Sequence, residues 1–170
     1  CAALMRSVIR NIRLALKNPS DYMARSNLFW DSTLSENRLI KLGKQCDFAC
    51  HLMAHQLGAY TDCNHGQAVA VLQPVYYRHI YKSGLSKFVR YAQHVWGICE
   101  ENRTEEEMAE MGICALDRFI KEIGLPKSLK KLGIKNGKVL KEIAESCHYS
   151  PGSYRRLKAE EILEIFKECY

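Results

Sequence analysis

The sequence predicts an all-α protein, organised as a single helical bundle domain, and three observations support that prediction. Apolar residues recur three or four positions apart through most of the 170 residues, which is the spacing of one helix face. No run of alternating apolar and polar residues is convincing as a β-strand. Glycine and proline, which punctuate loop-rich and all-β folds, number only 10 and 4. The length suits one domain with one sizeable core.

The first half of the chain predicts four helices. Residues 2–16 form the first helix, with an apolar stripe every fourth residue that begins at Leu4. A long second helix is expected over residues 21–43. A third helix is expected over 47–59. The fourth covers 65–82, bent or interrupted at its internal proline, because proline lacks a backbone N–H.

The second half of the chain predicts shorter helices. One is expected over residues 85–96. Another begins at Thr104, where Glu107 three residues later completes a capping-box signature, and it ends at Gly124. The remaining short helices are expected over 127–132, 136–147 and 159–168.

Cysteine and tryptophan side chains are expected mainly inside the protein. The chain has eight cysteines but no CxxC motif and no visible secretory signal, which favours a reducing, cytoplasmic setting. Cys99, Cys114 and Cys169 lie in apolar helical patterns and are expected as small buried side chains. Trp30 and Trp96 are expected in the core.

The net charge of +6 is concentrated in one stretch. Residues 127–141 hold six lysines and no acidic residue, which accounts for the whole excess. A nucleic-acid surface normally adds arginine and aromatic side chains to such a patch, and this stretch has neither. We therefore expect a solvated helical surface and no nucleic-acid partner. The chain also has no run of eighteen apolar residues, so no membrane span is expected.

Three histidines form the pattern with the clearest chemical meaning. His51 and His55 are four residues apart, so they project from nearly the same helix face. His65 follows turn and capping residue types, which places it in the first turn of the next helix. Gly66 then removes a side chain beside His65 and would permit close approach of a ligand. Imidazole is the commonest metal ligand in proteins, so the spacing favours a metal site.

Two well-placed histidines are too few for a catalytic site, which typically uses three protein ligands and one open position. Asp47 lies four residues before His51 and is one candidate for a third ligand. A histidine close to the metal but not bound to it could move a proton. A structural zinc site is an alternative, although its spacings match no common zinc knuckle. That site would use Cys46, Cys50, Cys63 and His65.

The region around these histidines resembles a known family. Its motifs are His51-xxx-His55-Gln-Leu-Gly-Ala and Asp62-xx-His65-Gly66-xxx-Ala70-xxx-Pro74. They resemble the signature of the iron-containing (group III) alcohol dehydrogenases, which have a dehydroquinate-synthase-like fold, and above all the NAD(P)H-dependent butanol dehydrogenase branch. Residues 115–134 and 159–165 also resemble the C-terminal part of that family, so the resemblance covers essentially the whole chain.

The resemblance implies a metal-dependent oxidoreductase. Members bind NAD(P) in an N-terminal α/β domain, and one Asp and three His in a C-terminal helical domain hold one divalent metal. The last two ligands match His51 and His65. The histidine that matches His55 lies near the nicotinamide and the substrate and takes part in proton movement. Fe(II) and Zn(II) both suit such ligands, and the implied substrates are small alcohols and aldehydes.

The first residues of the chain fit a missing N-terminal part. The chain opens on Cys1 rather than Met, and the helix over 2–16 has no capping residue before it. The family's other two ligands come from an Asp-xxx-His motif that would lie ahead of Cys1, as would the dinucleotide-binding domain. We therefore expect residues 1–170 to be the C-terminal metal-binding domain of a longer dehydrogenase, inactive by itself.

An alternative function is a helical interaction or assembly module without a catalytic metal. In that case the histidines are incidental, and the lysine-rich stretch or an uncovered apolar surface would bind a partner. Such an apolar surface would also favour assembly into a homo-oligomer.

Overall fold

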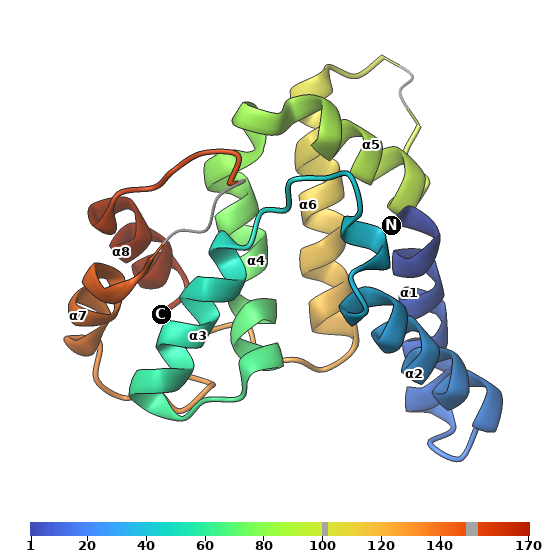
Figure 1. Cartoon of the computed structure of the whole chain (residues 1–170), viewed down its shortest axis with the longest axis horizontal. Helices are drawn as coiled ribbons and strands as arrows, with labels where there is room; N and C mark the ends of the chain where they lie inside the picture. The colour runs from blue at the N-terminus through green and yellow to red at the C-terminus, as the bar shows by residue number, and fades with distance from the viewer. Residues whose placement is uncertain (100–101, 149–152) are drawn as a thin grey trace. The chain divides into compact units, whose positions relative to one another are not determined.

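The computed structural model describes residues 1–99, 102–148 and 153–170, and these residues form an all-α structure (Figure 1). The described residues hold eight α-helices, two short 3-10 helices and no strand. The helices are α1 (Ala2–Lys17), α2 (Tyr22–Glu36), η1 (Leu39–Lys41), α3 (Ala49–Thr61), α4 (His65–Ile80), η2 (Tyr81–Gly84), α5 (Leu85–Trp96), α6 (Glu105–Glu122), α7 (Val139–Ser146) and α8 (Ala159–Glu168). The predicted fold class is confirmed.

The chain divides into two compact units. Unit 1 comprises Cys1–Lys44 and Ser86–Gly112, and unit 2 comprises Gln45–Leu85 and Ile113–Tyr170. Helix α6 contributes its first residues to unit 1 and its remaining residues to unit 2. The three candidate histidines all belong to unit 2.

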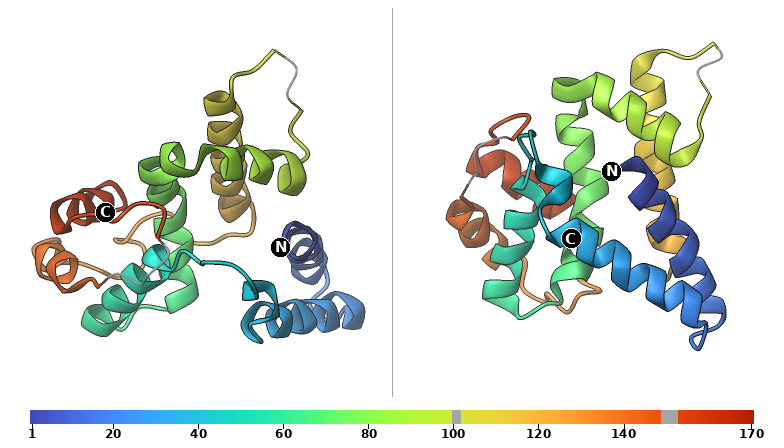
Figure 2. Two further views of the ribbon diagram at one scale, coloured as in Figure 1. Left: turned by 45° about the horizontal axis from the view of Figure 1, so that its top comes forward. Right: turned by 45° about the vertical axis from the view of Figure 1, so that its right-hand side comes forward.

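In unit 1, α1 and α2 form a helical hairpin and lie side by side in both views of Figure 2. Asp21 caps α2, because its Oδ1 accepts a hydrogen bond of 2.9 Å from the backbone N–H of Ala24. Helices α5 and α6 approach closely at Gly112, where a Cβ would lie 3.0 Å from the Cβ of Ala92. The small buried cluster at this contact consists of Val89, Ala92 and Met108.

In unit 2, α3 and α4 form a second hairpin, and α7 packs against α8. Helix α4 also contacts α8, and α3 contacts α7. Fully buried side chains from all four helices build the core between them. Burying one large apolar side chain stabilises the folded state by about 1.5–3 kcal/mol. The buried side chains include Leu57, Leu72, Tyr76, Leu140, Ile143, Ile165 and Phe166. This packing fixes the two helices that carry the histidines.

The capping box predicted at the start of α6 is confirmed. The backbone N–H of Thr104 donates to Oε2 of Glu107 at 2.7 Å, and the backbone N–H of Glu107 donates to Oγ1 of Thr104 at 3.2 Å. The fourth helix was expected to be interrupted or bent at Pro74. It is not interrupted, because α4 runs through Pro74 from His65 to Ile80.

Two other predicted helices are wrong in extent. The helix expected over residues 21–43 ends at Glu36, because Arg38 has a positive φ of 67° that no right-handed helix accepts. The helix expected over 127–132 is a series of turns, and α7 begins only at Val139. The lysines of residues 127–141 are exposed as expected, although most of these residues lie in turns and loops rather than in a helix.

Several side chains expected inside the protein are on its surface. Trp30 is 62% exposed, because it lies on the solvent side of α2. Cys99 and Cys114 are exposed, whereas Cys169 is buried as predicted. All eight cysteines are free thiols. No helix among the described residues has the length and apolar character needed to cross a membrane.

Candidate metal site

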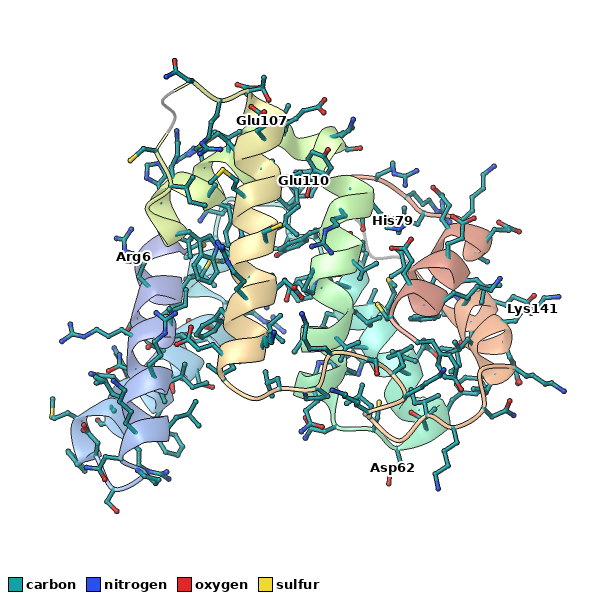
Figure 3. The ribbon with its side chains drawn as sticks, turned by 180° about the vertical axis from the view of Figure 1, so that it is seen from behind. Arg6, Asp62, His79, Glu107, Glu110 and Lys141 are labelled. Carbon is teal, nitrogen blue, oxygen red and sulfur yellow. The ribbon has the colours of Figure 1, made fainter. Side chains whose placement is uncertain are left out.

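The turn between α3 and α4 places His65 beside the histidines of α3. Asp62 ends α3 with a φ of 54°, the left-handed conformation that aspartate tolerates better than most residues. Asn64 then caps α4, because its side-chain oxygen accepts a hydrogen bond of 3.1 Å from the backbone N–H of Gln67. His65 therefore occupies the first turn of α4, as predicted. Figure 3 shows Asp62 at the tip of this turn, directed away from the helices.

The three histidine rings converge to within contact distance. The ring centroids of His51 and His55 are 4.5 Å apart, those of His51 and His65 are 4.6 Å apart, and those of His55 and His65 are 4.5 Å apart. The Nε2 atoms of His51 and His55 are 2.9 Å apart, and Nδ1 of His51 is 3.2 Å from Nε2 of His65. Each ring offers a nitrogen within 4.8 Å of the other two, which is close enough to share one ion.

The environment of His65 favours the form of imidazole that binds metals. Burial, and secondarily the neighbouring His55, lower the pKa of His65 below its usual value of 6.5. A metal requires the neutral ring as its ligand. Nδ1 of His65 is also buried without a hydrogen-bond partner among the described residues. The donor set thus fits a divalent ion that prefers imidazole, such as Fe(II) or Zn(II).

The alternative zinc site with three cysteines is wrong. Among the described residues, one group of three or more histidine, cysteine and carboxylate side chains is close enough to share an ion. That group is His51, His55 and His65, and it includes no cysteine. Cys50 is buried, and burial raises the pKa of its thiol, which disfavours the thiolate that zinc requires. At Gly66 an added Cβ would meet only the side chain of Asn64, at 3.5 Å, so no other protein segment approaches closely there.

Asp47 is not a third ligand of this site. Helix α3 starts at Ala49, two residues later than predicted, so Asp47 lies outside the helix that carries His51. Its Oδ1 accepts a hydrogen bond of 2.9 Å from the backbone N–H of Ala49. Its Oδ2 accepts from the hydroxyl of Tyr76 at 2.8 Å and from the backbone N–H of Tyr154 at 3.1 Å. The carboxylate is therefore engaged by three donors away from the histidines.

Sequence reasoning missed the contacts that hold α3 and α4 in place. Gln56 accepts a hydrogen bond of 3.0 Å from the hydroxyl of Ser146 on α7. His79, near the end of α4, has its Nε2 2.9 Å from a carboxylate oxygen of Glu168 on α8, and Figure 3 shows it on the side of α4 toward that helix. No local sequence motif predicts these pairs, because their members are 89 or 90 positions apart.

One known protein family matches the whole of this all-α chain. Residues 1–170 match the family model described as "Fe-containing alcohol dehydrogenase family, C-terminal". This chain belongs to that family and corresponds to its C-terminal domain.

Individual relatives agree with this assignment. NADH-dependent butanol dehydrogenase A of Clostridium acetobutylicum is 37% identical over 172 residues, a match that covers 99% of this chain and 44% of that protein. NADPH-dependent aldehyde reductase YqhD of Escherichia coli is 29% identical over 145 residues, covering 84% of this chain and 37% of that protein. The crystal structure of NADH-dependent butanol dehydrogenase A from Thermotoga maritima superposes with a TM-score of 0.89 at 28% identity, covering 99% of this chain and 44% of that one.

Proposed function

We propose that this chain supplies the metal-binding helical domain of an oxidoreductase that interconverts alcohols and aldehydes with NAD(P). The observation that carries the proposal is the convergence of His51, His55 and His65 in a chain of the iron-containing alcohol dehydrogenase family. The butanol dehydrogenases and the aldehyde reductase among its relatives carry names for this kind of reaction.

Each histidine has a separate role in this proposal. His51 and His65 hold a divalent metal, Fe(II) or Zn(II), through their ring nitrogens. A metal bound there would supply Lewis-acid polarisation of the substrate oxygen. His55 is exposed and lies within hydrogen-bond distance of His51, so it can exchange a proton between the site and solvent.

The nicotinamide cofactor is assigned to a part of the protein beyond these residues. The chain spans about half the length of the curated relatives that it matches. We infer that a dinucleotide-binding domain precedes it in a longer dehydrogenase and that the domain supplies NAD(P) and completes the metal ligand set. A small alcohol or aldehyde would bind where the two domains meet.

Two measurements test the proposal. Equilibrium dialysis of the chain against Zn(II) or Fe(II) should give one ion per chain, bound weakly because half of the ligand set is absent. NADH-dependent reduction of butanal should be undetectable for the same preparation. An absence of specific metal binding would contradict the proposed site. Aldehyde reduction by the chain alone would contradict the proposal that a separate domain binds the cofactor.

A second candidate function is self-association as a helical interaction module. The observation that favours it is a group of exposed large apolar side chains within Cys1–Lys44, several of them more than 60% exposed. The group includes Tyr22, Met23, Phe29, Trp30, Leu39 and Leu42. Its partner would be a second copy of this chain.

A further inference from the structure

The α3–α4 hairpin is closed at one end and must be held at the other. The turn over residues 62–64 joins the two helices at one end. His51 lies in the first turn of α3 and His65 in the first turn of α4, so a change in the angle between the helices changes the separation of the two rings. Two imidazoles on different helices share an ion only while that separation is kept.

Asp47 ties the opposite end of the hairpin. Its Oδ1 accepts the backbone N–H of Ala49, the first residue of α3. The same carboxylate accepts the hydroxyl of Tyr76, which lies three turns after His65 on α4. Tyr76 is only 2% exposed. Burial and the adjacent carboxylate raise the pKa of the Tyr76 hydroxyl, so this hydroxyl keeps its proton and remains a donor throughout the pH range in which proteins fold.

A third hydrogen bond to the Asp47 carboxylate comes from a segment near the C-terminus of the chain. The backbone N–H of Tyr154 donates to Oδ2 of Asp47. The ring of Tyr154 lies directly against Gly84, where a Cβ would come within 2.6 Å of a ring carbon. Leu157, three residues later, is 1% exposed. The segment that carries Tyr154 is thus fixed at Gly84 and in the core.

We propose that Asp47 is a positioning residue for the metal site: by joining the start of α3 to Tyr76 and Tyr154, it holds His51 at the separation from His65 that one ion requires. The inference rests on the proposed function for its chemical purpose, although the geometric effect can be measured without a metal. Asp47 lies four residues before His51, outside α3, and is not among the three side chains close enough to share an ion.

The direct test is the nuclear Overhauser effect between the ring protons of His51 and His65 in the metal-free full chain. Their centroids, 4.6 Å apart, are close enough to give a cross-peak. Asp47→Ala should lose this cross-peak, and Asp47→Asn, which keeps one acceptor oxygen, should retain part of it. Tyr170→Phe is the matched control, because it removes a hydroxyl that donates to the carbonyl of Lys135 at 2.9 Å, in the same unit and without contact with Asp47.

Two gentler variants keep the test decisive if Asp47→Ala does not fold. Tyr76→Phe removes only the hydroxyl donor, and Gly84→Ala displaces the ring of Tyr154. Each should weaken the cross-peak between His51 and His65, while Tyr170→Phe leaves it unchanged. A cross-peak of wild-type intensity in both Tyr76→Phe and Gly84→Ala would overturn the proposal.

Metal binding provides the second readout. Titration with Co(II), followed by its visible absorption, should show affinity lowered about tenfold in Tyr76→Phe, with an altered spectrum, and unchanged in Tyr170→Phe. Equal affinity and an identical spectrum in Tyr76→Phe and wild type would also overturn the positioning role. A wild-type chain that binds no Co(II) would refute the proposed metal site, and the metal-free cross-peaks would then still decide the role of Asp47.

Discussion

At the residue scale, the candidate site combines three imidazoles in different surroundings. His65 is half-buried, and its pKa is lowered first by burial and then by His55. His55 is exposed at the edge of the cluster. A half-buried neutral ring suits a permanent ligand, and an exposed ring suits proton exchange with solvent. Under the proposed function, the same side chain type would therefore serve two roles because its environment differs.

A buried carboxylate in unit 1 makes the first stability prediction. Asp31 is 5% exposed, and its Oδ2 has no hydrogen-bond partner among the described residues. A buried acceptor without a partner costs about 1–3 kcal/mol. We therefore expect Asp31→Ala to raise the free energy of unfolding by about 1 kcal/mol, measured by urea denaturation.

Ser32→Ala is the control for Asp31→Ala. Ser32 lies next to Asp31 on α2 and is exposed. Its replacement therefore measures the effect of alanine on helix stability without removing a buried polar group. A lower stability of Asp31→Ala than of wild type would show that the carboxylate has a stabilising partner.

At the scale of single helices, capping residues explain where several helices begin. The side chains of Asp21, Asn64 and Thr104 accept backbone N–H groups at the starts of α2, α4 and α6. Each bond satisfies a donor that has no partner within the helix. The cap at Asn64 matters most for the site, because it fixes the helical turn that holds His65.

The capping box of α6 predicts a pH dependence. The backbone N–H and the hydroxyl of Thr104 donate to the carboxylate of Glu107 and lower its pKa below the usual 4.5. The unfolded chain binds this proton more readily, so stability rises with pH in this range. The stabilisation should be complete above pH 4.5 and lost as the pH falls through the lowered pKa.

Denaturation of Glu107→Ala at a series of pH values tests this dependence. The variant should be less stable than wild type at pH 7, and the difference should shrink in acid. Glu105→Ala removes the same charge from the same helical turn, and its deficit at pH 7 should be smaller. A deficit for Glu107→Ala that persists unchanged below pH 3 would contradict the assigned cause.

Local patterns predicted the helices and the turn before His65, but not the contacts that fix them. The spacing of His51 and His55 and the capping types at 62–64 are encoded within a few residues of sequence. The contact of Asp47 with Tyr154 joins residues 107 positions apart, so no periodicity contains it. Asp47 was expected on the histidine face of α3 because of its spacing. It instead precedes the helix, since its side chain bonds to the N–H of Ala49.

Burial was the least predictable property of single side chains. Apolar character placed Trp30 in the core, yet α2 belongs to a two-helix hairpin with one face open to solvent. Cys114 shares a helix with two buried neighbours, Ile113 and Ala115, and points the other way. A helix pattern identifies an apolar side, and only the packing of other elements decides how much of that side is covered.

At the scale of the whole molecule, the exposed apolar side chains of Cys1–Lys44 predict association between copies. Sedimentation velocity should show a concentration-dependent dimer. The double variant Phe29→Ser/Trp30→Ser, which removes two side chains that are 69% and 62% exposed, should shift the equilibrium to monomer. Tyr60→Ser changes an exposed aromatic residue outside this surface and should leave the dimer intact. A wild-type chain that stays monomeric at every concentration would refute self-association.

The central claim is that His51 and His65 hold a metal in a domain of the iron-containing alcohol dehydrogenase family, while His55 moves protons. Co(II) titration of the chain and three alanine variants, followed by visible absorption, tests it most directly. His51→Ala and His65→Ala should abolish saturable binding, because each removes a ligand. His55→Ala should keep the affinity within about threefold of wild type. Removing a residue that supports a ligand typically lowers metal affinity about tenfold, and removing an exposed histidine that does not bind the ion should lower it less. Equal loss in all three variants, or no saturable binding in the wild type, would contradict the account.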